Sequence, residues 1–253
     1  MIGLPLPIYP THCPLPTTHY PLPIFVSLSI IIPCLNEAEG IVGTLKALQP
    51  LRRRGVEVIV VDGGSSDGTV AQSRPWADQV LTTARGRAAQ MNAGAACAHG
   101  ELLLFLHADC LPPMEADGLI INGLNRERKS WGRFDVRIIG KHPLLRVVEV
   151  LMNLRSRLTG IATGDQGIFV TRSLFEAAGH FPEIALMEDI ALSKRLKRFS
   201  APLNLRHAIV TSGRRWEQHG VLRTILLMWR LRLEYWLGAD PNALALRYAA
   251  HKQ

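Results

Sequence analysis

Short apolar runs alternate along the first half of this chain with segments of helical periodicity. Each run has the length of one buried strand, and the runs cover residues 27–32, 56–61, 79–82 and 101–106. Pro33 is expected to end the first strand. Helices are predicted over residues 38–48, 69–73 and 87–98. Strands that alternate with helices form a mostly parallel sheet covered on both faces, so we expect a doubly wound α/β fold.

The second half of the chain predicts longer helices and fewer strands. Alternation of polar and apolar residues over 131–139 predicts an exposed antiparallel strand, and a short strand is expected at 168–171. Helices are predicted from Pro112 to Arg128, over 144–158, from residue 187 onward and over 221–237. The last of these is expected to pack on the core, and the alternative is that it lies in a bilayer interface.

Length and composition suit one large core with additions at the ends. At 253 residues and 47% hydrophobic, the chain can bury a single α/β core. Seven prolines among the first 23 residues are incompatible with a regular helix, so residues 1–26 are predicted to be a disordered leader. The main domain is expected over 27–220 and C-terminal helices over 221–253. No run of roughly 18 uncharged apolar residues occurs, so no membrane span is predicted.

The charge is concentrated near the C-terminus. The net charge is +8, and residues 206–253 hold eight Lys and Arg against three acids. A basic segment beside an anion site suits a diphosphate or an anionic membrane surface, and a merely solvated surface is the alternative. Nucleic acid is not expected as a partner, because no recognition motif accompanies the basic residues. The four cysteines have no zinc or disulfide spacing, which favours a cytoplasmic protein.

Two predicted strands end in an aspartate. Asp62 follows the second strand and Asp109 follows the fourth. Ligands of open α/β sheets bind beyond the carboxyl ends of the strands, so both carboxylates should face one crevice. Asp109 could hold Mg²⁺ or Mn²⁺, which prefer oxygen ligands, or it could cap the following turn. Asp62 could accept a hydrogen bond from a ribose or base, or from nearby backbone amides.

Three further segments could carry chemistry. Arg87 opens a predicted helix, where a guanidinium and free amides favour an anion. Glu188 and Asp189 begin another, and one of them could accept a proton from a hydroxyl or simply cap the helix. Arg214, Arg215 and Trp216 could bind a diphosphate and stack on a sugar, or form a plain basic loop.

These residues together resemble the glycosyltransferase family 2 enzymes, which have the GT-A fold. The resemblance covers about residues 27–220 and is carried by four pieces in the family's order, at 30–37, 60–69, 107–109 and 188–189. It implies donor-binding residues at Pro33, Asn36, Glu37, Asp62, Arg87 and Asp109. It also implies that Asp189 is the general base with Glu188 beside it, that Arg215 and Trp216 bind acceptor or diphosphate, and that His219 lies near the metal.

Two residues depart from the family's pattern. His107 replaces the first of two acids that usually flank one residue of the metal motif, so the metal would rest on Asp109. Ser212 replaces the glutamine that usually stands three residues before Arg-Trp, which weakens the acceptor role of that loop.

A bacterial subgroup associated with arsenosugar biosynthesis is similar in three further segments. These are Trp131–Asp135, Thr163–Gln166 and Gly213–Trp216. This resemblance adds Gly164, Asp165, Gln166 and Arg214 to the acceptor or diphosphate side of the site.

The resemblance implies an inverting, metal-dependent transfer of a sugar from a nucleoside diphosphate, with uracil as the expected base, to a hydroxyl of a small molecule or lipid. A protein of this kind would be cytoplasmic and could contact the inner face of an anionic membrane. Two rivals remain open at this point. One is a nucleotidyltransferase of related fold, which shares the need for phosphate and metal, and the other is a non-catalytic module that binds a nucleotide sugar.

Overall fold

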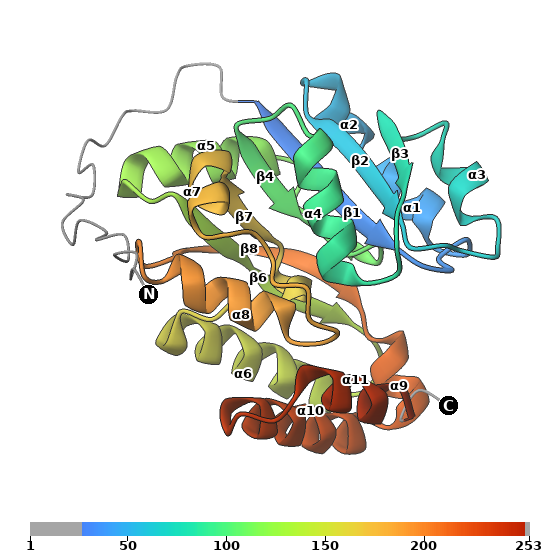
Figure 1. Cartoon of the computed structure of the whole chain (residues 1–253), viewed down its shortest axis with the longest axis vertical. Helices are drawn as coiled ribbons and strands as arrows, with labels where there is room; N and C mark the ends of the chain where they lie inside the picture. Colours follow the sequence, from blue (N-terminus) through green and yellow to red (C-terminus); the bar gives the residue numbers. More distant parts are fainter. Residues whose placement is uncertain (1–26, 251–253) are drawn as a thin grey trace, which may run out of the picture.

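The computed structural model describes residues 27–250, apart from the side chains of Arg215, Gln218, His219 and Ala250. One eight-stranded sheet lies at its centre, with the strand order β3-β2-β1-β4-β7-β6-β8-β5 (Figure 1). The strands are β1 (Leu28–Cys34), β2 (Glu57–Asp62), β3 (Gln79–Thr82), β4 (Leu102–Phe105), β5 (Cys110–Leu111), β6 (Trp131–Ile139), β7 (Ile168–Thr171) and β8 (Leu203–Ser212).

The first four strands form the parallel half of the sheet, as predicted. Alternate residues of β1 point to opposite faces, so Ile30 packs in one core cluster and Ile31 in another. The Ile30 face is covered by α1 (Ile41–Ala47), α2 (Gln49–Arg53) and α5 (Ala116–Glu127). The opposite face is covered by α4 (Arg87–Cys97), α7 (Arg172–Ala177) and α8 (Glu188–Leu196). Helices therefore cover both faces, and the doubly wound class is confirmed.

The second half of the sheet is mixed. β7 pairs antiparallel with both β4 and β6, whereas β6 pairs parallel with β8. The register of β6 against β8 shifts between Phe134 and Asp135, which is a β-bulge. Helix α6 (Leu144–Thr159) packs against the far end of β6 through Leu145, Val148 and Met152.

Two expectations about the strands were wrong, and one strand was not predicted. β1 runs through Pro33 to Cys34, because β4 pairs with β1 only as far as Ile31 and therefore needs no N–H from Pro33. β6 is not exposed: all but two of its residues are buried, since Phe134 packs in the cluster that includes α5, and Val136 and Ile138 pack against α6. β8 escaped prediction because polar residues such as Arg206 and His207 interrupt its apolar pattern.

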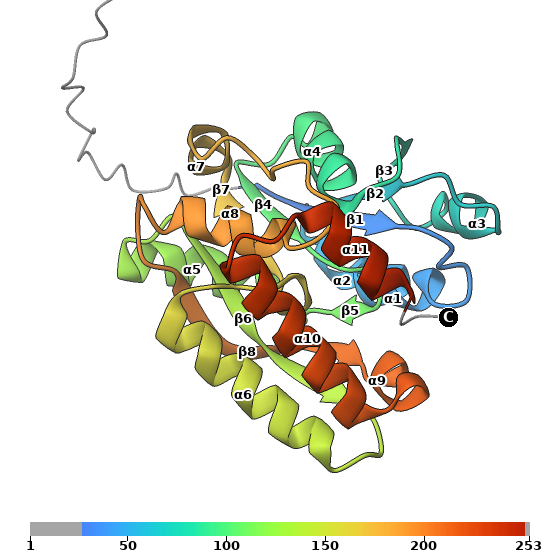
Figure 2. The same ribbon diagram turned by 60° about the horizontal axis from the view of Figure 1, so that its bottom comes forward.

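The remaining helices are α3 (Thr69–Ser73), α9 (Arg214–His219), α10 (Val221–Trp236) and α11 (Pro241–Ala250). Figure 2 shows α10 alongside α6, with α11 turned back toward the sheet. Leu231 of α10 and Leu244 of α11 pack with Met187 at the start of α8. The helix α10 therefore packs on the core only in part: among its described residues, Val221 and Leu231 are the buried ones. No helix within residues 27–250 is apolar and long enough to cross a bilayer.

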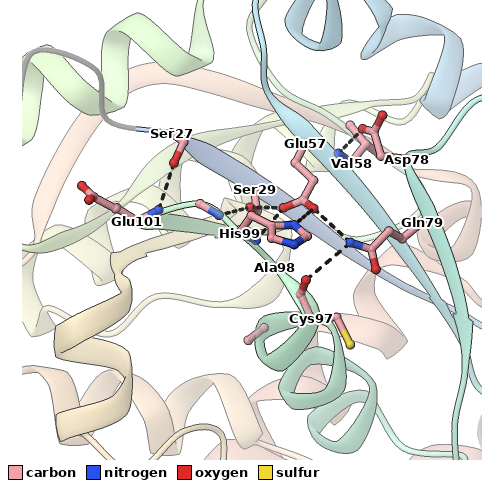
Figure 3. Close-up of polar contacts among 12 residues, drawn as sticks. Ser27, Ser29, Glu57, Val58, Asp78, Gln79, Cys97, Ala98, His99 and Glu101 are labelled. Atoms are coloured by element: carbon pink, nitrogen blue, oxygen red, sulfur yellow. Dashed lines mark hydrogen bonds and ion pairs between the residues drawn. The ribbon is translucent and has the colours of Figure 1, made fainter.

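A polar cluster closes the amino end of the parallel strands (Figure 3). The Glu57 carboxylate accepts hydrogen bonds from Ser29 Oγ at 2.5 Å, from the backbone N–H of His99 at 2.9 Å and from Gln79 Nε2 at 3.0 Å. Burial opposes ionisation of this carboxyl, but the hydrogen bonds from Ser29 and His99 hold its pKa below the ordinary value. The cluster ties β1, β2, β3 and the end of α4 together at the end of the sheet away from the predicted site.

Candidate active site

The loops that follow β1 and β2 are hydrogen-bonded to each other. The backbone N–H of Asn36 donates to Ser65 Oγ at 2.8 Å, and Asn36 Oδ1 accepts from the N–H of Ser66 at 2.9 Å. The N–H of Glu37 donates to Thr69 Oγ1 at 2.8 Å. Asn36 has a left-handed φ of 53°, a conformation that asparagine tolerates better than most residues. The two loops therefore form one rigid rim beyond β1 and β2.

The Asp62 side chain stabilises this rim through hydrogen bonds to its backbone. The side chain is buried, and Oδ2 accepts hydrogen bonds from the N–H groups of Gly64 at 2.8 Å and Ser65 at 2.9 Å. One carboxylate oxygen of Asp62 therefore binds nearby backbone amides, which was the expected alternative to a contact with a ribose or base. Beside it, burial and then the charge of Asp62 raise the pKa of the Cys34 thiol to about 12, so this thiol stays protonated.

A cavity of about 360 Å³ lies beyond β4, between the loops and the C-terminal helices. It gathers residues from distant parts of the chain. The sequence-predicted residues that line it are Arg87, Asp109, Gly164, Asp165, Asp189 and Trp216. Thus the candidate metal residue and the candidate general base open onto one space.

The floor of the cavity holds a small polar group. His107 Nδ1 lies 3.1 Å from Asp165 Oδ1, and ligand atoms of His107, Asp109 and Cys110 lie within 4.8 Å of one another. Burial lowers the pKa of His107, but the hydrogen bond to Asp165 and the charges of Asp165 and Asp109 together raise the pKa overall. Burial raises the pKa of the Cys110 thiol well above its ordinary value, so it is a poor metal ligand. A carboxylate and an imidazole fit Mn²⁺ better than they fit Mg²⁺.

Gly164 lies against His107. A Cβ at Gly164 would stand 2.2 Å from His107 Nε2, so this position requires glycine. Gly164 begins the short 3-10 helix η1 (Gly164–Gln166), and its N–H donates to Asp189 Oδ2 at 2.9 Å. The glycine thereby joins the floor of the cavity to the candidate base.

Asp189 lies in the first turn of α8, two residues after a residue with an unusual backbone conformation. Met187 has a left-handed φ of 69°, which turns the chain into the helix. Asp189 is half-buried and lines the cavity, whereas Glu188 is buried and pairs with Arg87 at 3.1 Å. Burial raises the pKa of Glu188 and the charge of Arg87 opposes that shift. The two acids therefore have different surroundings, and Asp189 is the one that reaches the cavity.

Several predicted residues lie away from this cavity. Pro33, Asn36, Glu37 and Asp62 belong to the neighbouring rim and do not line it. Gln166 is fully buried and accepts hydrogen bonds from Thr163, so it stabilises η1 rather than facing a ligand. Arg214 is exposed and lies 3.4 Å from Glu39. The side chains of Arg215 and His219 lie outside the described part of the chain.

The sequence reasoning missed two cavity residues, Arg155 on α6 and Arg232 on α10. Both stand in otherwise apolar helical stripes. Arg155 follows Val148 and Met152, and Arg232 follows Ile225 and Met228, at spacings of three and four residues. A positively charged residue within an apolar helical stripe is the sequence signal that could have identified them.

Comparison with known proteins gives a family match. Residues 29–172 match the sequence profile described as Glycosyl transferase family 2. The poly-beta-1,6-N-acetyl-D-glucosamine synthase of Staphylococcus epidermidis is 24% identical over 189 residues, which is 68% of this chain and 46% of that protein. The chain thus spans about half the length of the curated relatives it matches.

Solved structures share the fold. The mannosyltransferase PcManGT from Pyrobaculum calidifontis, in complex with GDP-Man and Mn²⁺, has a TM-score of 0.58 and 23% identity, over 89% of this chain and 69% of that one. S. aureus TarS 1–349, in complex with UDP-GlcNAc, has a TM-score of 0.60 and 18% identity, over 74% of this chain and 58% of that one.

Proposed function

Because this chain belongs to glycosyl transferase family 2 and has the GT-A fold, we propose that it is an inverting, metal-dependent glycosyltransferase. It moves a sugar from a nucleoside diphosphate to a hydroxyl of an acceptor. The observation that carries this proposal is that Asp109 and Asp189 line one cavity beyond the parallel strands. A carboxylate for a cation and a carboxylate for a proton are the two groups that such a transfer needs.

The donor binds across the rim and the cavity. In this proposal the base and ribose lie against Pro33, Asn36, Glu37 and Asp62, and the diphosphate extends toward Asp109 and Arg87. The rigid hydrogen bonding of the rim supports this assignment, because a preformed loop loses little entropy on binding. A nucleoside diphosphate with uracil is the proposed leaving group, as the UDP-GlcNAc bound to TarS suggests.

Asp109 holds the divalent cation, with His107 beside it and His219 as a further proposed ligand. When bound, a divalent cation neutralises the charge that develops on the departing diphosphate. The Mn²⁺ of PcManGT supports manganese as the first ion to test. In this proposal, Arg87 and Arg215 add positive charge near the same phosphates.

Asp189 is the proposed base. It removes the proton of the acceptor hydroxyl, whose oxygen forms a bond to the anomeric carbon as the bond to the diphosphate breaks. The proton ends on Asp189 and the electron pair leaves with the diphosphate, so one step inverts the configuration. The hydrogen bond from Gly164 fixes the direction of the carboxylate. Gly164, Asp165 and Trp216 would then lie around the acceptor.

We also propose that α6 and α10 bring the protein to an anionic membrane. Large apolar side chains are exposed along both helices. They include Val150, Leu154 and Leu158 on α6, and Leu222, Leu226, Leu233 and Trp236 on α10. A contiguous exposed apolar surface marks an interaction site, and the basic excess of residues 206–253 suits anionic lipid. A lipid acceptor would then meet the cavity at the membrane.

The finer assignment to the arsenosugar-associated subgroup is a proposal that rests on three motifs. In the structure, the Trp131–Asp135 segment of β6 supports α6 through Asp135, which pairs with both Arg133 and Arg157. The other two segments flank the cavity. An assay with an arsenic-bearing hydroxyl acceptor tests this assignment, and a preference for arsenic-free acceptors would contradict it.

One experiment separates this function from its rivals. The protein is incubated with nucleoside-diphosphate sugars and Mn²⁺, after a thermal-shift screen for donors that raise Tm. Release of free nucleoside diphosphate, with transfer of the sugar, is the expected result. Release of pyrophosphate in a parallel incubation with a nucleoside triphosphate and a sugar 1-phosphate would favour a nucleotidyltransferase. Binding of the donor without turnover against any acceptor would favour a non-catalytic module.

A further inference from the structure

Two arginines line the cavity opposite the donor rim without a complete set of partners. Arg155 reaches it from α6 and Arg232 from α10. Nε and Nη2 of Arg155, and Nε of Arg232, are buried and have no hydrogen-bond partner. Buried guanidinium nitrogens are normally paired, because desolvating a cation without compensation is unfavourable. These atoms therefore indicate a missing acceptor of hydrogen bonds.

The surroundings of Arg155 and Arg232 disfavour their charged forms. Apolar residues form the walls next to them, including Val148, Met152 and Met228. Burial and then the charge of Arg232 lower the pKa of Arg155 to about 10. Burial also lowers the pKa of Arg232, although Asp189 and Asp165 oppose this shift. Both groups are nonetheless cationic at neutral pH, so the cavity contains two neighbouring positive charges.

We propose that Arg155 and Arg232 bind an anionic group, a phosphate or a carboxylate, that the acceptor carries beside its reactive hydroxyl. This inference rests on the proposed function, in which Asp189 faces the acceptor. An anion with several oxygens can accept hydrogen bonds from both guanidinium groups and separate their charges. It would at once satisfy the buried nitrogens and fix the acceptor next to the base.

The position of the pair in the fold assigns it to the acceptor and not to the donor. The donor rim follows β1 and β2, whereas α6 packs on β6, and β4 and β7 lie between β1 and β6 in the sheet. The donor diphosphate is proposed to reach Asp109 and Arg87 from the β1 side. Arg155 and Arg232 enter from α6 and α10, and the charge of Asp189 acts on both guanidinium groups.

The cavity also suits an apolar part of the acceptor. Leu151 and Trp229 line it, and their side chains are 43% and 58% exposed, so they continue onto the outer surface of α6 and α10. An acceptor with an anionic group next to an alkyl segment would fill this path. A membrane lipid phosphate and a free phosphorylated metabolite share the anionic chemistry, and the experiment distinguishes them.

The test is calorimetric binding of hexyl phosphate to the full chain, with inorganic phosphate and hexanol as matched probes. We expect hexyl phosphate to bind and hexanol to bind at least ten-fold more weakly. Arg155→Met and Arg232→Met should each weaken hexyl phosphate at least ten-fold. Arg223→Met is the control, because Arg223 is exposed on the same helix as Arg232 and does not line the cavity. Tighter binding of hexyl phosphate than of inorganic phosphate supports a lipid acceptor, whereas equal binding supports a free phosphate.

Three results would overturn the inference. The first is hexyl phosphate binding that the two methionine variants leave unchanged, or no binding at all. The second is an equal loss of nucleoside diphosphate binding in these variants, which would assign the pair to the donor. The third is a marked fall in the Tm of Arg155→Met, since removal of a cation whose buried Nε and Nη2 have no partner should leave Tm unchanged or raise it.

The outcome can be separated from that of the proposed function. Asp189→Asn should lower the rate of transfer by about 10²- to 10⁴-fold and keep the binding of hexyl phosphate. If no sugar transfer is found with any donor while the arginine pair still binds hexyl phosphate, the proposed function fails and the anion site stands. If transfer occurs and the methionine variants retain the wild-type KM for the acceptor, the anion site fails alone.

Discussion

The Asp189 carboxylate accepts a 2.9 Å hydrogen bond from the backbone N–H of Gly164. The same glycine is packed so closely on His107 that no side chain fits between them. The candidate base and the floor of the cavity are therefore positioned by one residue that has no side chain. A change at Gly164 should disturb the catalytic geometry without removing any chemical group.

Gly164→Ala should lower kcat/KM by about 10²-fold, the effect of a displacement of about 1 Å in a reacting group. The added methyl group must push η1 away from His107 and thereby lengthen the bond to Asp189. Steady-state kinetics with the donor found in the screen measures the effect. Gly43→Ala is the control, because a Cβ at Gly43 of α1 meets nothing within 4 Å. Wild-type kinetics in Gly164→Ala would show that η1 does not position the base.

Asp189→Asn should lower kcat by about 10²- to 10⁴-fold, the usual contribution of general base catalysis. The amide retains the size of the carboxylate and an oxygen for the Gly164 N–H, but it cannot take the proton of the acceptor. Calorimetry should find donor affinity unchanged. Loss of donor binding in this variant would make Asp189 a structural residue. Asp240→Asn, at an exposed aspartate before α11, serves as the control.

Asp109→Asn should weaken Mn²⁺ binding and abolish metal-dependent donor binding, because the amide lacks the negative charge that attracts the cation. Titration of Mn²⁺ into the protein in the presence of nucleoside diphosphate measures the loss. Excess chelator should reproduce it in the wild type. Full turnover in chelator would remove the metal from the reaction.

Glu57→Gln should lower Tm by about 2–4 °C at neutral pH, the shift that ~1 kcal/mol produces in a chain of this size. Its pKa is lowered by folding, so its stabilising effect is present above the unfolded pKa of about 4.3 and is lost as pH falls through the folded value. The Tm difference between variant and wild type should therefore shrink below about pH 4. Glu101→Gln, exposed at the same end of the sheet, should leave Tm unchanged (Figure 3). A difference that grows in acid would contradict this account.

Trp236→Glu should reduce binding to vesicles that contain anionic phosphatidylglycerol, measured by cosedimentation. Trp236 is 72% exposed on α10, and an indole there would enter the bilayer interface. Met114→Glu is the matched control, because Met114 is 63% exposed before α5, away from α6 and α10. Equal binding of both variants and the wild type would argue against a membrane-facing surface on α10.

Much of the parallel half of the fold could be predicted from the sequence. The residues of β1 and β2 are buried on both faces, so their apolar runs are nearly unbroken and their positions are clear. β6 was located at the correct residues, but its burial was missed, because alternating polarity normally marks a half-exposed strand. Arg133 is the reason: it is fully buried and paired with Asp135, so a polar residue occupies a core position.

The site was predicted in part. Asp109, Arg87 and Asp189 do meet in one cavity, since they stand at the carboxyl end of a strand or the amino ends of helices, positions that topology fixes. Arg155 and Arg232 could not be placed in the same way. Their helices have no fixed relation to the parallel strands until β6 and β8 are assembled, and β8 was not predicted.

The reversal of direction at β7 has an evolutionary consequence. Strands on one side of β7 position the donor rim, and the elements on the other side position α6 and the helices that follow it. Under the proposed function, substitutions on α6 and α10 would change the acceptor specificity and leave the donor rim unchanged, so few mutations would be needed for a new acceptor.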